Sequence, residues 1–278
     1  MTVAVPPTSR LRRLIVCADD FALHAGASQG ITQLAAQGRL SATSALVLSP
    51  RWALDAPRLR DLRGQLDVGL HLDWTSAFAR AQGHGRPLAR VMARALLGGL
   101  RPDQARPVIE QQLDAFEAHW QAPPDHVDGH QHVQQFAGIR TALVQALLAR
   151  YGRGPMPYLR ISRPARPRAE LKSRLIASLG ADALENIAKN AGVTRARALF
   201  GTYDFGRNEA AYARRMTAWL ADVPDGAILM CHPAGPAPAH ADSAAARQAE
   251  LAYLAGPRWP EALARAGVQL ARGAAALA

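Results

Sequence analysis

Residues 14–21 read Leu-Ile-Val-Cys-Ala-Asp-Asp-Phe, a short apolar run that ends in two adjacent carboxylates. An apolar run of this length bounded by polar residues is typical of a buried β-strand. A helical pattern follows at 24–37, and Gly38 stands where a left-handed residue commonly ends a helix. The segment therefore predicts a strand followed by a helix, the unit from which parallel sheets are built.

Short apolar runs alternate with longer helical patterns over the rest of the chain. We expect strands at 14–18, 43–48, 67–72, 126–129, 158–162, 199–203, 227–231 and 268–271. We expect helices at 24–37, 103–120, 139–151, 168–179, 208–220 and 244–254. The chain of 278 residues is close to the roughly 250 residues of a (β/α)8 barrel. We therefore expect an α/β fold, an irregular TIM-barrel-like (β/α) barrel with mostly parallel strands, in a single catalytic domain over residues 1–278.

Two segments are predicted to lie outside the regular elements. The stretch 74–102 is rich in Gly and Arg, contains Pro87, and is expected to form an elaborated loop above a strand end. The segment 160–174 is strongly basic and holds two prolines. We interpret it as an exposed connection, either a solvated loop or a cradle for an anionic group of a substrate or a membrane surface.

The composition, with 49% hydrophobic and 20% charged residues, is that of a globular protein. Cys17 and Cys231 are the two cysteines, and both lie inside apolar runs, so a disulfide framework is not expected. The first residues lack the pattern of a secretory signal, and no run reaches the roughly 18 apolar residues of a membrane span. We expect a cytoplasmic protein.

The chain is strongly basic, with 33 Lys and Arg against 22 Asp and Glu and a formal net charge of +11. Most of the basic residues are arginine, which together with the alanine content is typical of a GC-rich coding sequence. A basic surface also attracts anionic membranes and nucleic acid. Of these two partners we favour peripheral contact with a membrane. We do not expect binding to nucleic acid.

Asp19 and Asp20 directly follow the first expected strand. Consecutive residues at a strand end point in different directions, so one carboxylate can bind a metal while its neighbour takes a proton from water. The alternative is that one of them caps the following helix. The pair therefore indicates metal-assisted hydrolysis only in combination with other ligands.

Histidines supply those further ligands at the ends of three other expected strands. His71 lies in an apolar run, His232 follows the run 227–231, and residues 125–132 read Asp-His-Val-Asp-Gly-His-Gln-His. A single histidine in such a place is often a core or loop residue. Together, however, the four segments lie at the C-terminal ends of predicted strands, the rim where barrel active sites assemble.

Residues 125–132 have the highest density of potential metal ligands in the sequence. Strand alternation would place Asp128, His130 and His132 on one face, so that one imidazole binds a metal and a neighbouring group supports it. Imidazole and carboxylate are common ligands of catalytic divalent ions. The cluster therefore predicts a metal centre.

Four motifs occur in one order: ADDF at 18–21, GLHL at 69–72, DGHQH at 128–132 and HPAG at 232–235. In this order they resemble the YdjC-like family of carbohydrate deacetylases, which includes chitooligosaccharide deacetylases and deacetylases associated with hopanoid biosynthesis. The resemblance implies a metal-dependent hydrolase that removes an acetyl group from an N-acetylated sugar, either an N-acetylglucosamine-type oligosaccharide or a hopanoid glycolipid. It also implies an irregular barrel and one divalent metal ion, with Zn, Mg and Ni as candidates.

The resemblance assigns roles residue by residue. The implied metal ligands are Asp20, His71 and His130. Asp19 is the implied general base and His232 the implied general acid, with Arg160 keeping the Asp19 carboxylate ionised. As candidates for substrate binding we add three further side chains, Trp74, His132 and Tyr203.

Two positions depart from the family pattern. Gln134 stands where a third histidine is usual, which puts a contact near the substrate in doubt but leaves the ligand set intact. Ala22 stands where a glycine is common after ADDF.

Two other functions stay open as alternatives. One is a basic protein that binds membrane or nucleic acid and carries a structural metal, although such sites usually close with four ligands that often include cysteine. The other is a glycosidase with paired carboxylates. A homodimer is also left open.

Overall fold

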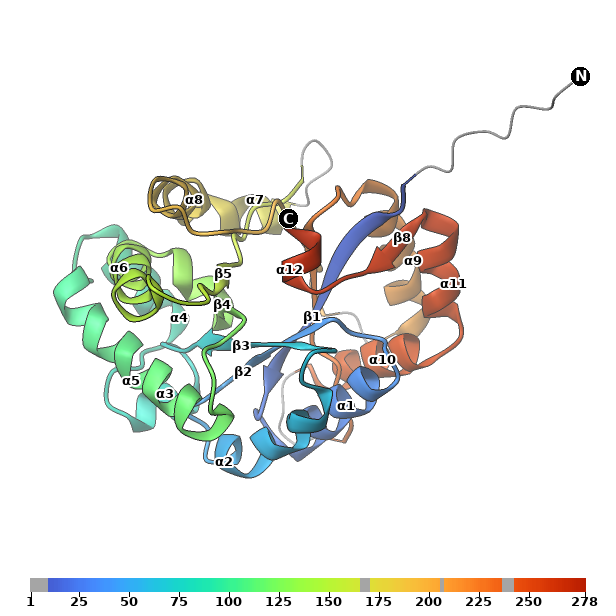
Figure 1. Ribbon diagram of the computed structural model, residues 1–278, viewed down its shortest axis with the longest axis horizontal. Coiled ribbons are helices and arrows are strands. Elements are labelled where there is room, and N and C mark those ends of the chain that lie inside the picture. The colour runs from blue at the N-terminus through green and yellow to red at the C-terminus, as the bar shows by residue number, and fades with distance from the viewer. Residues whose placement is uncertain (1–9, 166–170, 206–207, 237–242) are drawn as a thin grey trace, which may run out of the picture.

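The computed structural model describes residues 10–165, 171–205, 208–236 and 243–278. Its centre is a curled parallel sheet with helices packed around the outside (Figure 1). The strands found in this part of the chain are β1 (Arg12–Phe21), β2 (Ala42–Ala45), β3 (Asp67–Leu72), β4 (His126–Gly129), β5 (Tyr158–Leu159), β6 (Leu199–Phe200), β7 (Ala227–Cys231) and β8 (Val268–Leu270).

The strand order is β5-β4-β3-β2-β1-β7-β6, and β8 pairs with the first residues of β1. An isolated bridge between Leu159 and Arg195 joins β5 to the segment that leads into β6. Because β5 and β6 stand at opposite ends of the strand order, this bridge brings the two edges of the sheet together. The predicted α/β fold, an irregular and mostly parallel barrel, is confirmed.

Helices follow most of the strands and cover the outer side of the sheet (Figure 1). The longer helices are α1 (Ala25–Ala36), α5 (Pro102–Trp120), α6 (Ile139–Tyr151), α8 (Ala181–Asn190), α9 (Glu209–Asp222), α10 (Ala244–Ala255) and α11 (Arg258–Ala266). The shorter ones are α2 (Arg51–Asp55), η1 (Ala56–Leu62), α3 (Ala77–Ala81), α4 (Leu88–Leu96), η2 (His130–Gln135), α7 (Leu171–Ser178) and α12 (Gly273–Ala276).

The expected elements are present, with some differences in length. The bounds of β3, β4, β7 and α6 coincide with the prediction, whereas β5 and β6 are shorter than expected. The helices α8 and α11 were not predicted. In the basic segment, residues 166–170 lie outside the described residues, and 171–174 begin α7.

The stretch 74–102 contains α3 and α4, so the expectation of an irregular loop is wrong over much of its length. Ser76 begins α3, because its Oγ accepts hydrogen bonds from the backbone N–H groups of Phe78 and Ala79. Pro87 directly precedes α4, where its lack of an N–H group costs nothing. Both helices still belong to the connection between β3 and α5, on the side where the strands end.

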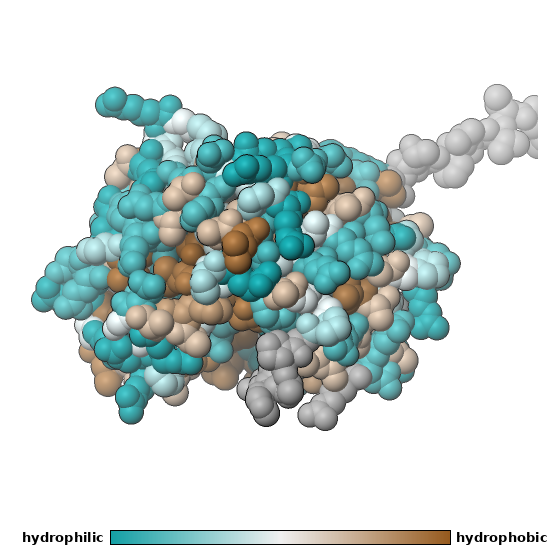
Figure 2. Space-filling model, turned by 90° about the horizontal axis from the view of Figure 1, so that it is seen from below, coloured by the Kyte–Doolittle hydropathy of each residue, from teal (hydrophilic) through white to brown (hydrophobic). Residues whose placement is uncertain are grey.

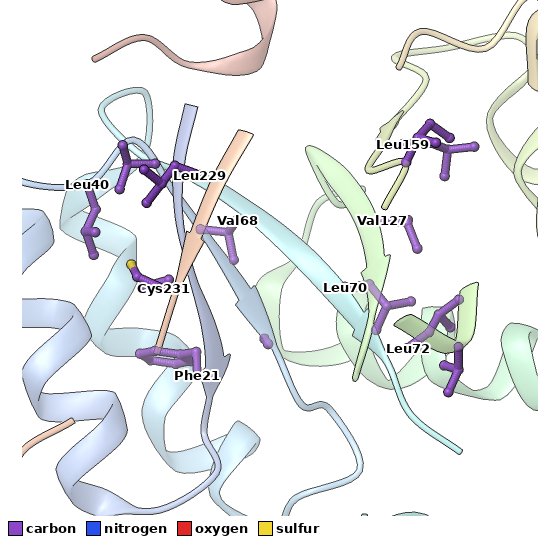
Figure 3. Packing of buried hydrophobic residues seen from close by; sticks show 14 of the residues in the cluster. Phe21, Leu40, Val68, Leu70, Leu72, Val127, Leu159, Leu229 and Cys231 are labelled. Carbon is purple, nitrogen blue, oxygen red and sulfur yellow. The ribbon is translucent and has the colours of Figure 1, made fainter. Parts of the chain in front are cut away.

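Alternation along the strands divides the apolar side chains into two clusters. In β3, Val68, Leu70 and Leu72 belong to the large cluster between sheet and helices, part of which Figure 3 shows. In β1, Ile15 and Cys17 belong instead to a smaller cluster with residues of β2, β5, β6 and β7, inside the curl of the sheet. Alternate residues of each strand therefore face the interior of the barrel.

The outer surface is mostly polar. On the face shown in Figure 2, hydrophilic residues predominate and apolar residues form small groups. Among the described residues, we find no helix with the length and apolar character needed to cross a bilayer.

Candidate active site

The predicted site residues gather where the parallel strands end. Asp19 and Asp20 lie at the end of β1, and His71 lies at the end of β3. His130 directly follows β4, and His232 directly follows β7. Since the C-terminal ends of parallel strands meet at one rim, residues far apart in sequence come together there.

Both carboxylates of the β1 pair can reach the site because the backbone turns between them. Asp19 continues the inward alternation of Ile15 and Cys17. Asp20 has a φ of 67°, in the left-handed region, and the register of β1 against β2 shifts between Ala18 and Phe21. This irregularity frees Asp20 from strand alternation, so that both acids contribute to one site.

Asp20, His71 and His130 form a set of potential metal ligands. One ligand atom from each lies within 4.8 Å of the others. Asp20 Oδ1 lies 3.5 Å from His71 Nε2 and 3.1 Å from His130 Nδ1. One carboxylate and two imidazoles around a common point are a donor set typical of a catalytic divalent ion, which uses three protein ligands. These residues fit a metal.

Asp128 fixes the orientation of the His71 ring. Its Oδ1 lies 2.6 Å from His71 Nδ1, so that nitrogen donates a hydrogen bond and leaves Nε2 facing Asp20. Burial disfavours the charged ring, but the carboxylates of Asp128, Asp19 and Asp20 together outweigh burial and raise the pKa of His71 to about 9 in the metal-free protein. A metal must therefore displace a proton from this ring.

Asp20 is strongly held in its ionised form. Burial alone would raise its pKa, but Arg247, His130 and His71 together lower the pKa of Asp20 well below its ordinary value. The carboxylate is thus ready to accept a cation at neutral pH.

Two other groups of potential ligands lie nearby, Cys17 with His126 and Asp128, and Asp19 with His71 and Asp128. Both are fully buried and include Asp128, which is bonded to the Arg160 guanidinium. A group of ligands with no exposed member offers an entering ion no contact with solvent. The set around Asp20, whose His130 side chain is 20% exposed, is therefore the better fit.

Arg160, directly after β5, binds the predicted base. Its Nη1 and Nη2 donate to Asp19 Oδ1 and Oδ2 at 2.9 and 3.0 Å, and Nη2 also contacts Asp128. Both carboxylates and the guanidinium are buried, where such paired hydrogen bonds are strongest. Arg160 therefore holds the Asp19 carboxylate in one orientation.

His232 directly follows β7, the strand that pairs with β1. Its Nε2 is 3.9 Å from Asp19 Oδ2, and the ring of Phe205 contacts it edge to face at 5.3 Å between centroids. Burial lowers the pKa of His232 to about 4 despite the nearby Asp19. The ring is therefore neutral at pH 7.

His132 lies close to the site, but not by the alternation expected. Gln131 and His132 have φ values of 55° and 62°, so the chain leaves the strand at Gly129. The prediction that alternation places Asp128, His130 and His132 on one face is wrong for this reason. His132 Nδ1 instead lies 2.9 Å from Ser162 Oγ, and burial lowers the pKa of His132 to about 3.

Gln134, where the resemblance leads us to expect a histidine, is a buried residue. Its Nε2 donates to the Arg160 carbonyl oxygen at 3.2 Å and to Ser162 Oγ at 3.1 Å. It thereby links η2 to the segment that carries Arg160.

Trp74 and Tyr203 lie near the rim but are buried, with 3% and 5% exposure. Trp74 contacts His84, and Tyr203 packs in an aromatic cluster with Tyr212 and Trp219. Little of either ring is open to a sugar as the site stands. Their part in substrate binding stays a prediction.

Two residues of the site were missed by the sequence analysis, Arg247 and Glu250 of α10. Arg247 Nη2 lies 2.5 Å from Asp20 Oδ2, and Glu250 Oε2 accepts the His232 N–H at 2.6 Å. The available signal was periodicity, because both positions fall on the helix face that also carries the buried Ala246 and Tyr253.

Comparisons with known proteins show which proteins the chain is similar to. The family model described as YdjC-like protein matches residues 13–265. A chitooligosaccharide deacetylase of Serratia marcescens is 28% identical over 235 residues, 80% of this chain and 81% of that protein. A carbohydrate deacetylase of Homo sapiens is 28% identical over 305 aligned positions, 93% and 89% of the two chains.

A similar fold is found among solved structures. A cellobiose-phosphate cleavage protein of Enterococcus faecalis superposes with a TM-score of 0.71 at 18% identity, covering 96% of this chain and all of the other.

Proposed function

Because the chain belongs to the YdjC-like family, we propose that it is a metal-dependent hydrolase that removes the acetyl group from an N-acetylated sugar. One observation carries the proposal. The ligand set Asp20, His71 and His130 lies beside an Asp19 carboxylate held by Arg160, with His232 Nε2 3.9 Å from that carboxylate. A candidate cation site, a candidate base and a candidate proton carrier thus lie side by side at the C-terminal ends of the strands.

A divalent ion held by Asp20, His71 and His130 would polarise the acetamide carbonyl and make a bound water more acidic. Two imidazoles and one carboxylate suit zinc or nickel better than magnesium, which prefers oxygen ligands. We therefore expect Zn or Ni to support activity better than Mg.

The protein's own residues would move the proton. Asp19 accepts it from the attacking water, since Arg160 keeps this carboxylate ionised and aimed. His232 is neutral at pH 7, so it can act as an acid only after receiving a proton. Transfer from Asp19 to His232 Nε2 supplies it, and the ring then protonates the amine nitrogen as the carbon–nitrogen bond breaks.

The test is acetate release from a panel of N-acetylglucosamine oligosaccharides and glycolipids, with hopanoid-linked sugars included, after metal analysis of the purified protein. We expect acetate and a free amine. Asp19→Asn should keep its metal and lose most turnover. Release of reducing ends without acetate would instead support a glycosidase, and near-normal turnover of Asp19→Asn would remove this residue from the mechanism.

A single catalytic domain over residues 1–278 is part of the proposal. The pairing of β8 with Arg12–Leu14 of β1 supports it, because the last strand joins the first in one sheet. The cytoplasmic location stays a prediction.

We also infer peripheral contact with an anionic membrane, which would bring the enzyme to a lipid-linked sugar. Leu96, at the end of α4, is 72% exposed, and Leu171 and Leu175 of α7 are 80% and 61% exposed. Neither helix contains an acidic residue, whereas both carry basic ones. Exposed leucines among basic residues are typical of interfacial helices.

The two helices are neighbours, because Leu96 of α4 and Ala177 of α7 line the same groove. We expect sedimentation with vesicles containing phosphatidylglycerol but not with pure phosphatidylcholine, and loss of binding in a Leu171→Ser, Leu175→Ser variant. Leu54→Ser on α2, 69% exposed, is the matched control. Equal binding by the double variant, or salt-sensitive binding to DNA alone, would contradict membrane contact.

A further inference from the structure

α10 carries two ionisable side chains on its buried face. Arg247 is 9% exposed and Glu250 is fully buried, while Gln248 between them is exposed. A buried charge costs free energy unless a partner compensates it, so each of these side chains needs a specific contact. Both contacts lead to the candidate active site.

Arg247 determines which oxygen of Asp20 is free. Its Nη2 donates to Asp20 Oδ2 at 2.5 Å, while Asp20 Oδ1 faces the ring nitrogens of His71 and His130. The two oxygens therefore have separate partners. With Oδ2 held by the guanidinium, Oδ1 is presented to the point that the two imidazoles share.

The backbone at Asp20 makes this contact important. A non-glycine residue at a φ of 67° is strained, and its side chain needs outside contacts to stay in one place. Arg247 reaches this carboxylate from a helix that begins more than 220 positions later in the chain.

Glu250 holds the loop that carries His232. Its Oε2 accepts the His232 backbone N–H at 2.6 Å, and its Oε1 accepts the Tyr203 hydroxyl at 2.5 Å. One turn earlier, the Arg247 carbonyl oxygen accepts the backbone N–H of Ala234 at 3.2 Å. The loop after β7 thus forms two hydrogen bonds with a single turn of α10.

We propose that this turn of α10 sets the geometry between the two halves of the site, with Arg247 positioning the metal ligand Asp20 and Glu250 positioning the proton carrier His232. Three residues apart, they lie on one face of the helix and move together. The inference rests on the proposed function for the role of His232, whereas the role of Arg247 concerns metal binding alone.

We expect Arg247 to affect metal affinity and Glu250 to affect kcat. A general loss of stability would change both quantities together. In Arg247→Ala we expect the metal to bind about 10–100-fold more weakly, as for other groups that orient a ligand. Arg247→Lys, which keeps the positive charge but has one ammonium nitrogen in place of the planar guanidinium, should lie between this variant and the wild type. Isothermal titration of the metal-free protein with Zn²⁺ gives the affinities and needs no substrate.

Glu250→Ala should leave Zn²⁺ affinity unchanged and lower kcat at least about tenfold, because the His232 loop loses its anchor. Glu250→Gln should recover most of that loss, since its amide oxygen can accept the His232 N–H and its NH2 group can donate to Tyr203. The imidazole NMR signals of His232 should shift in Glu250→Ala and stay in place in Glu250→Gln. This readout does not depend on turnover.

Gln248→Ala, on the exposed side of the same turn, is the matched control and should change none of these quantities. The inference fails if Arg247→Ala binds Zn²⁺ like the wild type, or if the His232 signals of Glu250→Ala do not move. It also fails if Arg247→Ala and Glu250→Ala lose only thermal stability. A wild-type protein that binds Zn²⁺ but releases no acetate would refute the proposed function and leave the Arg247 result standing.

Discussion

Arg160 donates one hydrogen bond to each oxygen of Asp19, and the same guanidinium also contacts Asp128. Asp128 in turn holds Nδ1 of the predicted ligand His71. The base and the metal centre are therefore joined through one buried arginine. Its position directly after β5 lets it reach across the interior of the barrel to the end of β1.

Arg160→Lys should lower turnover by about 10–100-fold, as is typical when a residue behind a catalytic group is lost. A lysine cannot supply two parallel donors to Asp19 and a third contact to Asp128. Steady-state kinetics would measure the effect. Arg163→Lys, a neighbouring half-buried arginine bonded to Asp182 and Glu185, is the control. Equal losses in both variants would count against a specific role for Arg160.

His130→Ala should abolish tight metal binding, because one of three ligands is lost and the remaining pair cannot hold a cation in place. Metal content after dialysis, measured by atomic emission, reports this directly. His84→Ala removes a partly buried histidine that contacts Trp74 outside the ligand set, and should retain its metal. A full complement of metal in His130→Ala would exclude this residue as a ligand.

Metal affinity should depend on pH through His71. In the metal-free protein the pKa of this ring is raised to about 9, so below that pH a metal competes with a bound proton. The apparent affinity should rise about tenfold per pH unit as the pH increases toward 9. Titrations of Zn²⁺ at pH 7 in buffers of different ionisation enthalpy should show about one proton released.

Asp128→Asn removes the carboxylate that contributes most to the raised pKa of His71, so the metal affinity of this variant should vary less with pH around neutrality. An equally steep dependence in the variant would show that another group supplies the proton.

Much of the fold and of the site could be predicted because both depend on local patterns. β3 and β7 are mostly apolar runs, and β4 lies in the cluster of histidines and aspartates at 125–132. The bounds of all three strands were predicted residue by residue. The same strands end in His71, His130 and His232, so a barrel topology is enough to bring these rings together.

The parts that could not be predicted depend on contacts between distant segments. Gln131 and His132 adopt the left-handed backbone conformation although neither is a glycine. Strand alternation in the sequence gives no sign of this turn. Arg247 and Glu250 look like ordinary charges of an alanine-rich helix until α10 is seen packed against the site. Their partners lie in β1 and after β7, and no short sequence pattern connects them.

Gly69 of the GLHL motif is required by packing inside the barrel, and its replacement should disturb stability and metal binding together. A Cβ at this position would lie 2.4 Å from two atoms of the His126 ring, which is stacked on Tyr158 and cannot retreat freely. Gly69→Ala should therefore cost about 1–3 kcal/mol, as overpacking of a core typically does. Urea unfolding would measure the change in the free energy of unfolding.

The displaced His126 would also disturb the ligand set. Its Nε2 lies 3.0 Å from Ser44 Oγ, which donates to Asp128 Oδ2 at 2.5 Å, and Asp128 orients His71. We therefore expect weaker Zn²⁺ binding in Gly69→Ala as well. Gly154→Ala is the control, because a Cβ there meets no atom within 4 Å. If Gly69→Ala unfolds at the same urea concentration as Gly154→Ala and binds Zn²⁺ equally well, close packing of His126 does not constrain the site.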